Sequence, residues 1–395
     1  MKSKLIWMQG MLTLLAALAG CGDSASSTID DTETTSSGSA GTGGSTAGTG
    51  DSTADTEEST AITEDGVAGT LKAPYKWHPG HYVAPVGSMT LDSVLNEIEN
   101  RPLFRGVQLR YTWRSIEKSK GVYDFSAIHA DLDKVQGKHK RLLILLMTKA
   151  FGGGKAAPDY LRTPEYEGGV FTYDSPSNSG ENIKLYVPAV RNRLIKLVQA
   201  LGAELDQEPY LDRIQFNETS LGQVSPDLTP AQKTAFFDNL LLVHRATVAA
   251  FPTTVVTQFV NFPTAYVLPK IPNDLPLSHV ALGGPDVFLD NPSLDNKAYT
   301  YYPPLSNVVP LSPSVQNEDY EVPYHGGPVS YQPVPDLYAK AKNELKANYI
   351  CWDARTWVVP GTSKVPWTEV KKLVDSLPQD DPAGGLNRQR PDALK

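Results

Sequence analysis

The chain has 395 residues, 31 glycines, 31 prolines and a formal net charge of −8. This acidic balance, without a basic stripe, gives no reason to expect a nucleic-acid partner. The histidines are scattered and no Cys/His cluster has metal-ligand spacing, so we expect neither a metal ion nor a cofactor.

The first twenty residues have the features of a targeting signal. Lys2 and Lys4 precede a short apolar stretch, as in a signal peptide. The segment ends in Leu-Ala-Gly-Cys at 18–21, which resembles the lipobox of bacterial lipoproteins. The alternatives are an ordinary signal peptide or an uncut membrane helix, but a membrane span needs about 20 apolar residues. The resemblance implies a lipid anchor on Cys21 in the cell envelope. Gly22 after the cysteine favours the outer membrane if the host is Gram-negative.

The next segment, residues 21–70, consists mainly of Ser, Thr, Gly, Asp and Glu. It has too little apolar surface to offset the entropy of ordering, so we predict a disordered tether. We place the signal peptide at 1–20, the folded domain at 71–380 and a C-terminal tail at 381–395, and we expect a monomer. Cys351 would be the remaining thiol, in the core.

Within the folded domain, apolar or β-branched runs alternate with helical patterns. Strands are predicted at 81–83, 104–111, 141–147, 210–216, 254–260, 278–284, 308–315 and 348–352, and helices at 91–98, 126–135, 187–205, 229–251, 334–345 and 366–377. The seventh strand is the weakest because it contains two prolines. Eight such repeats predict an α/β fold, a (β/α)8 (TIM) barrel. The alternative is an open doubly wound sheet, which is weakened because no nucleotide-binding glycine loop follows the early strands.

The fourth predicted strand ends in Asn217-Glu218. In a (β/α)8 barrel, catalytic groups lie at the C-terminal ends of the strands, so Glu218 is a candidate catalytic carboxylate; the alternative is an ordinary surface glutamate. A Gly-, Tyr- and Pro-rich insertion at 152–186 is predicted to cover this end of the barrel.

Two segments resemble the large retaining clan of (β/α)8 glycoside hydrolases, which includes β-galactosidase-like and cellulase-like families. Residues 113–125 contain W-R-S-I-E and G-V-Y-D-F, similar to the W-x-x-[IL]-E-P-x-x-G-x-Y-D-F segment that follows the second strand in that clan. Lys118 replaces the usual proline. Asn217-Glu218 is similar to the Asn-Glu pair of strand four. The resemblance implies hydrolysis of O-glycosidic bonds in a polysaccharide or oligosaccharide, with Glu218 as general acid/base and Asn217 binding the sugar 2-hydroxyl.

The resemblance also implies roles for three residues elsewhere in the barrel. Arg110, at the end of strand two, would pair with the nucleophile, and the alternative is a salt bridge at the barrel rim. Trp113 and Trp352 would stack on sugar rings, with Trp352 as the floor of a subsite. The alternative for both tryptophans is core packing.

The second carboxylate remains open. The clan has a nucleophilic glutamate at the end of strand seven, where this chain has Gln316, with Glu318 two residues later. Glu318 in the barrel mouth would permit retaining chemistry, whereas Gln316 there would imply an inverting, altered or inactive protein. Asp286 and Asp353, after strands six and eight, are further candidates. The alternative functions are therefore a non-catalytic glycan-binding lipoprotein and a structural lipoprotein.

Overall fold

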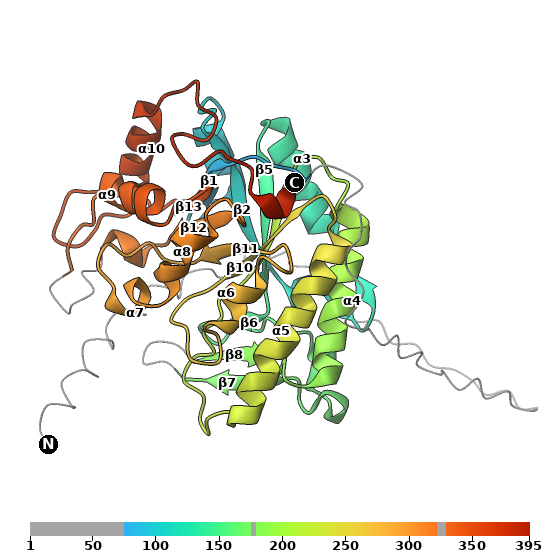
Figure 1. The fold of residues 1–395 in the computed structure, drawn as a ribbon. Coiled ribbons are helices and arrows are strands. Elements are labelled where there is room, and N and C mark those ends of the chain that lie inside the picture. The colour runs from blue at the N-terminus through green and yellow to red at the C-terminus, as the bar shows by residue number, and fades with distance from the viewer. Residues whose placement is uncertain (1–74, 175–178, 322–328) are drawn as a thin grey trace, which may run out of the picture. The chain divides into compact units, whose positions relative to one another are not determined.

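The structure is a computed structural model that describes residues 75–174, 179–321 and 329–395. The predicted signal peptide, Cys21 and the tether lie outside the described residues. Eight parallel strands form a closed barrel with the order β1-β13-β12-β11-β10-β9-β5-β2, so the predicted (β/α)8 fold is confirmed (Figure 1). The barrel strands are β1 (Gly80–Ala84), β2 (Phe104–Thr112), β5 (Arg141–Met147), β9 (Leu211–Phe216), β10 (Val255–Phe259), β11 (Ala281–Gly284), β12 (Leu311–Val315) and β13 (Tyr349–Asp353).

Along each strand, side chains alternate between the barrel interior and the surrounding helices. Arg213 of β9 lies across the barrel from β1 and β13, yet its guanidinium is 4.8 Å from the ring centroid of Tyr82 and 3.8 Å from that of Tyr349. These three side chains therefore point inward. Their neighbours Val83 and Ile350 belong to the main apolar core, which lies between the strands and the helices.

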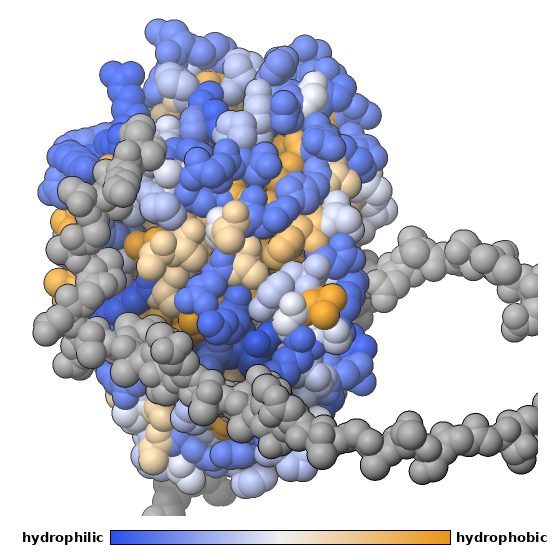
Figure 2. All heavy atoms as spheres, turned by 90° about the vertical axis from the view of Figure 1, so that its right-hand side faces the viewer, coloured by the Kyte–Doolittle hydropathy of each residue, from blue (hydrophilic) through white to orange (hydrophobic). Residues whose placement is uncertain are grey.

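The helices that follow the strands agree with the predicted periodicity. They are α1 (Leu91–Ile98), α3 (Ser126–Gly137), α4 (Pro188–Leu205), α5 (Pro230–Ala250), α9 (Val334–Ala339) and α10 (Pro366–Ser376), with the short helices α2 (Trp113–Ile116), α6 (Lys270–Asp274), α7 (Pro292–Asp295) and α8 (Tyr302–Leu305). Thr229 caps α5, since its hydroxyl accepts the amide hydrogen of Gln232. Figure 2 shows the side of the molecule that carries α4 and α5, which is mainly hydrophilic with apolar residues across its middle. No helix within the described ranges combines the length and the apolarity that crossing a membrane requires.

The insertion after β5 forms a small antiparallel sheet of β6 (Lys149–Ala150), β8 (Gly180–Ile183) and β7 (Val170–Tyr173). Because β6 follows β5 directly, this sheet lies at the C-terminal end of the barrel, toward the bottom of Figure 1. A second pair of short strands, β3 (Glu117–Ser119) and β4 (Val122–Tyr123), follows β2. The insertion predicted at 152–186 therefore borders the end where the candidate site is expected.

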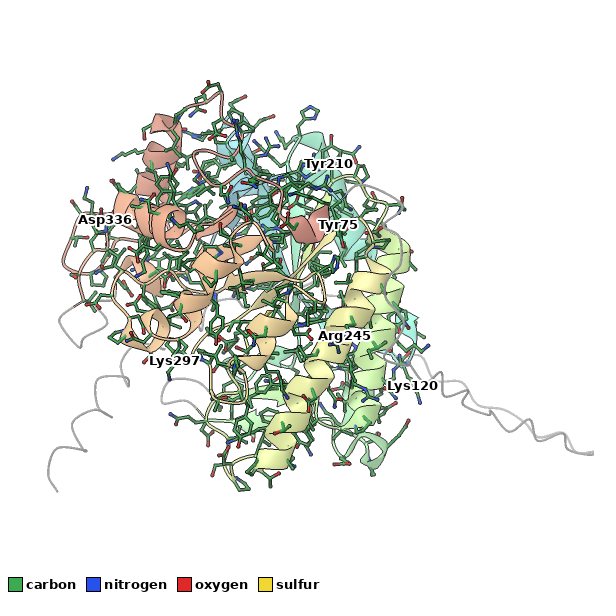
Figure 3. The ribbon with its side chains drawn as sticks, viewed as in Figure 1. Tyr75, Lys120, Tyr210, Arg245, Lys297 and Asp336 are labelled. Atoms are coloured by element: carbon green, nitrogen blue, oxygen red, sulfur yellow. The ribbon has the colours of Figure 1, made fainter. Side chains whose placement is uncertain are left out.

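The segment predicted as a C-terminal tail, 381–395, packs against the opposite end of the barrel. The backbone N–H of Ala393 donates to the carbonyl of Val308 at 3.0 Å, and Leu394 is buried. Arg390 donates to the carbonyl of Tyr75 at 3.1 Å, and Tyr75 lies beside the last turn of the chain in Figure 3. The two ends of the described chain thus meet at the N-terminal end of the barrel.

Candidate active site at the C-terminal end of the barrel

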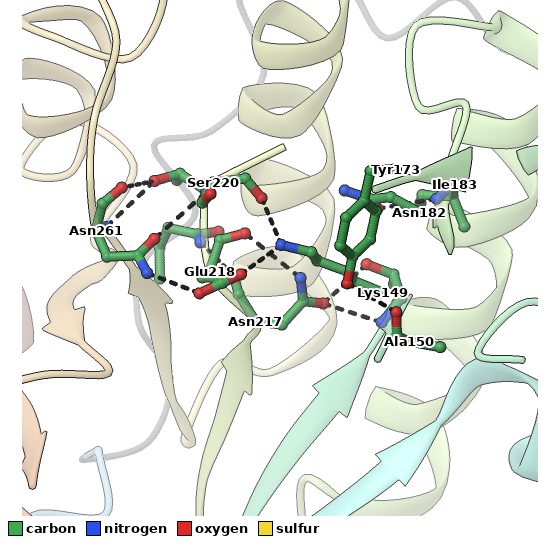
Figure 4. Close-up of polar contacts among 12 residues, drawn as sticks. Lys149, Ala150, Tyr173, Asn182, Ile183, Asn217, Glu218, Ser220 and Asn261 are labelled. Carbon is green, nitrogen blue, oxygen red and sulfur yellow. Dashed lines mark hydrogen bonds and ion pairs between the residues drawn. The ribbon is translucent and has the colours of Figure 1, made fainter. Parts of the chain in front are cut away.

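Glu218 follows β9 and lies at the barrel mouth, where its contacts come from two other strand ends (Figure 4). Its side chain is 19% exposed. Oε1 forms an ion pair with the ammonium of Lys149, and Oε2 accepts a hydrogen bond from Nδ2 of Asn261 at 2.7 Å. Both carboxylate oxygens are therefore already held by donors.

Lys149 is the cation of this pair, and its side chain is only 2% exposed. Its ammonium donates to the carbonyl of Ser220 at 3.0 Å. It also lies 4.9 Å from the ring centroid of Phe151 and 4.7 Å from that of Tyr173. Ring faces attract a cation, so the carboxylate, the carbonyl and the two rings all make favourable contacts with this ammonium. Through Tyr173, the insertion reaches the site.

The side-chain amide oxygen of Asn217 accepts hydrogen bonds from the protein itself. Oδ1 accepts hydrogen bonds from the backbone N–H and the hydroxyl of Thr148, each at 2.9 Å. The Nδ2 group faces the carbonyl of Glu218 at 3.4 Å. Any contact with a sugar hydroxyl would therefore come from the NH₂ end of this amide.

The carboxyl group next to Glu218 belongs to Asp286, in the loop after β11. Asp286 is 9% exposed, and its Oδ2 has no hydrogen-bond partner. Burial first, and then the charge of Glu218, raise the pKa of Asp286 well above its usual range; a side-chain hydrogen bond from Asn261 partly offsets this. Asn261 thus contacts both carboxyl groups.

Two further acidic groups, Asp353 and Glu318, lie at the mouth. Burial raises the pKa of Asp353 to about 7; the guanidinium of Arg110 opposes this shift and the charge of Glu318 adds to it. Burial also raises the pKa of Glu318, and Arg110 again opposes it. The structure therefore brings Arg110 near two of the predicted carboxyl groups, including Glu318.

The loop after β12 is fixed by carboxylates that accept backbone hydrogen bonds. Oδ2 of Asp319 accepts from the N–H of Gln316 at 3.0 Å and from that of Val287 at 2.8 Å. Oδ2 of Asp353 accepts from the N–H of Asn317 at 3.1 Å. Gln316 directly follows the last residue of β12 and is partly exposed.

The predictions that Trp113 and Trp352 stack on a sugar are wrong. Trp113 is fully buried, and its indole N–H donates to Glu117 at 2.6 Å. Trp352 is also fully buried; its indole N–H donates to Nδ1 of His81 at 3.0 Å, and its ring stacks on that imidazole. Because His81 also stacks on Tyr338 of α9, this side of β13 faces the helices.

Three residues near the mouth were missed by the sequence analysis. Lys149 and Asn261 each lie two residues beyond the end of a barrel strand, so the strand-end rule applied to Glu218 would also have selected them. Trp357 is in the loop after β13 and is 37% exposed. Its ring lies 5.1 Å from the guanidinium of Arg355 and packs over Gly87.

Within the described part of the chain, no group of three or more His, Cys, Asp or Glu side chains is arranged to hold a metal ion. At the mouth, Glu218 is held by Lys149 and Asn261, and Asp319 and Asp353 accept backbone N–H groups, whereas Oδ2 of Asp286 has no hydrogen-bond partner.

No family model matches the chain, and no curated protein matches it in sequence. Solved structures do match. A β-galactosidase from Marinomonas ef1 has a TM-score of 0.53 at 12% identity, covering 77% of this chain and 61% of that protein. A β-galactosidase from Bacillus circulans sp. alkalophilus has a TM-score of 0.55 at 10% identity, covering 78% and 56%. One from the haloarchaeon Halorubrum lacusprofundi has a TM-score of 0.50 at 11% identity, covering 80% and 57%.

This chain therefore spans less than two thirds of the length of these enzymes. At such low identity the similarity establishes the fold, and the structural neighbours are (β/α)8 glycoside hydrolases.

Proposed function

We propose that the protein is a glycoside hydrolase that cleaves O-glycosidic bonds of a polysaccharide or oligosaccharide. The observation that carries the proposal is the pair of carboxyl groups at the barrel mouth, Glu218 and Asp286, which contact the same amide of Asn261. Glycosidic cleavage needs one proton donor and one carboxylate that acts as nucleophile or base. The fold of the structural neighbours supports the same reaction class.

The charge of Glu218 acts on Asp286, so the two carboxyl groups lie near each other at the mouth. A close pair, about 5–5.5 Å apart, is the arrangement of retaining glycosidases, and we propose retaining chemistry for this pair. Glu318, near Arg110, is the alternative second carboxylate.

Trp357 is the best-supported surface for a sugar ring, because it is an exposed aromatic side chain in a loop at the C-terminal end of the barrel. Asn217 and Asp353 lie deeper at the same end and remain candidates for contacts with sugar hydroxyls. We also propose that a lipid anchor on Cys21 and the tether at 21–70 hold the enzyme at the cell envelope, close to an extracytoplasmic glycan.

The test is a panel of polysaccharides and oligosaccharides incubated with the purified protein and assayed for new reducing ends. We expect activity on at least one glycan. Glu218→Gln should reduce that activity by about 10²-fold or more, because positioned acid/base groups contribute about 10²–10⁴-fold. Exposed Glu344→Gln, in the helical layer, is the matched control. Equal activity of Glu218→Gln and the wild type would remove Glu218 from the mechanism.

A non-catalytic glycan-binding protein is the second candidate function. It is favoured by Gln316, an amide that directly follows β12, where the family resemblance implies a nucleophilic glutamate. Its signature would be calorimetrically measurable binding of a glycan from the same panel with no release of reducing ends.

A further inference from the structure

We infer that Glu218 is the ionised carboxylate of the site and Asp286 the proton donor, with Lys149 as the positioning residue that fixes this division. The inference rests on the proposed glycosidase function. It reverses the role that the family resemblance implies for Glu218, which is the general acid/base there.

The hydrogen bonds of Glu218 carry the first step. Lys149 holds Oε1 and the Asn261 amide holds Oε2. An ammonium has no acceptor, and the amide NH₂ group is a donor only. A proton on either oxygen of Glu218 would face one of these donors. The site therefore accommodates Glu218 as an acceptor-only carboxylate (Figure 4).

Lys149 cannot relieve this constraint by becoming the acceptor. Its side chain is 2% exposed and its ammonium donates to the carbonyl of Ser220 as well as to Glu218. The ring faces of Phe151 and Tyr173 lie within 5 Å of it and attract a cation. A neutral amine would lose the ion pair and both ring contacts.

Asp286 has the opposite surroundings. It is nine-tenths buried and its Oδ2 lacks a hydrogen-bond partner. The charged groups that face it come from three other elements: Glu218 after β9, Glu318 and Asp319 after β12, and Asp353 of β13. A proton on Oδ2 removes the repulsion from these carboxylates, and the raised pKa agrees with this assignment.

The reaction then balances in two steps. Asp286 transfers its carboxyl proton to the glycosidic oxygen as the bond between that oxygen and C1 breaks. A Glu218 oxygen forms the new bond to C1 and gives a covalent glycosyl–enzyme ester. In the second step, water attacks C1, its proton passes to the Asp286 carboxylate, and the bond between Glu218 and C1 breaks.

The deciding experiment compares two leaving groups on the sugar that the wild type releases. The 2,4-dinitrophenolate leaving group departs from C1 without being protonated, whereas the natural leaving group requires a proton. We expect Asp286→Asn to lose about 10²–10⁴-fold on the natural linkage but to stay within tenfold of the wild type in forming glycosyl–enzyme from the dinitrophenyl glycoside, seen as a burst of dinitrophenol. Added azide should release this intermediate and restore turnover. Glu218→Gln should lose both reactions.

The reverse pattern, with a dinitrophenol burst and azide rescue in Glu218→Gln, overturns the division of roles and leaves the proposed function intact. A wild-type protein that cleaves neither kind of glycoside overturns the proposed function and the division of roles together. Circular dichroism of each variant separates loss of chemistry from loss of folding.

Lys149 is tested through the rate of glycosyl–enzyme formation from the dinitrophenyl glycoside. Its ammonium holds Oε1 of Glu218, so Lys149→Met should slow the burst of each folded molecule by about tenfold or more, and Lys149→Arg, which keeps the cation, should restore much of the rate. A purely structural role would lower the folded fraction without changing the rate of each folded molecule. A folded Lys149→Met protein with an unchanged burst rate would overturn the positioning role.

Discussion

Two tryptophans near the end of β13 differ in their surroundings. Trp352 is a strand residue, and its neighbour Asp353 points toward the mouth. Because side chains alternate along a strand, the indole of Trp352 faces the helices, where its N–H donates a hydrogen bond to His81. Trp357 lies in the following loop and keeps 37% of its surface exposed. The first ring belongs to the core, and the second is available to a ligand.

Replacing these two residues should therefore have separate effects. Trp357→Ala should raise KM for the cleaved glycan about 3- to 10-fold, because aromatic contacts contribute about 0.5–1.5 kcal/mol, with little change in stability. Trp352→Phe should lower the free energy of unfolding by about 1–3 kcal/mol, because His81 loses its donor, with KM unchanged. Steady-state kinetics and urea unfolding measure both. A larger KM effect for Trp352→Phe would contradict the assignment.

Asp353 should make stability depend on pH. Burial raises its pKa to about 7 in the folded protein, whereas an unfolded aspartate has a pKa of about 3.9. The folded state binds the additional proton between these values, so the free energy of unfolding falls as the pH rises from about 4 to about 7.

Between pH 5 and pH 8 this decline amounts to about 3 kcal/mol, and Asp353→Asn should remove it, as measured by urea unfolding at the two pH values. The exposed Asp380→Asn is the control and should follow the wild type. Wild-type and Asp353→Asn curves that stay parallel between these pH values would refute the prediction.

At the scale of elements, the loops after β12 and β13 are joined by one buried guanidinium. Arg355 is 2% exposed; it forms an ion pair with Glu321 and donates to the carbonyl of Asn317 at 2.9 Å. The same guanidinium lies against Trp357. These contacts position Glu318 and Trp357 on one side of the barrel mouth.

Arg355→Met should destabilise the protein by about 3–5 kcal/mol, because removing one partner of a buried pair leaves the other charge uncompensated. Lys372→Met, which breaks an exposed pair with Glu369, should cost no more than about 1 kcal/mol. Denaturant unfolding of both variants provides the comparison. Similar losses for the two variants would show that the Arg355 contacts contribute no more than a surface pair.

At the scale of the whole molecule, the C-terminal segment, residues 381–395, packs against the barrel and stabilises it. Leu386 and Leu394 are buried, and Asn348 of the barrel donates to the carbonyl of Asn387 at 2.7 Å. Removal of residues 386–395 should lower the melting temperature by more than 10 °C, since losing even one buried leucine costs about 2–5 kcal/mol. Removal of the exposed Lys395 alone should have little effect. A truncated protein that melts with the wild type would mean that the segment only rests on the surface.

The sequence was sufficient to predict the barrel because its signals are periodic. The apolar run at 141–147 and the spacing of Val190, Leu194 and Leu197 specify a strand and a helix without knowledge of their neighbours. The site was harder to predict. Which strand end faces Glu218 depends on barrel order and register, so the sequence analysis missed the Lys149 contact, and the direction of Trp352 was assigned by resemblance alone.

The hydrogen bond between Trp352 and His81 joins residues 271 positions apart, where β13 closes the barrel against β1. During synthesis the ribosome must release nearly the whole folded domain before this seam can form. Until then β1 and β12 each have an unpaired edge, and unpaired edges recruit other strands. A chain terminated before residue 349 would keep both edges unpaired and would therefore be prone to aggregate.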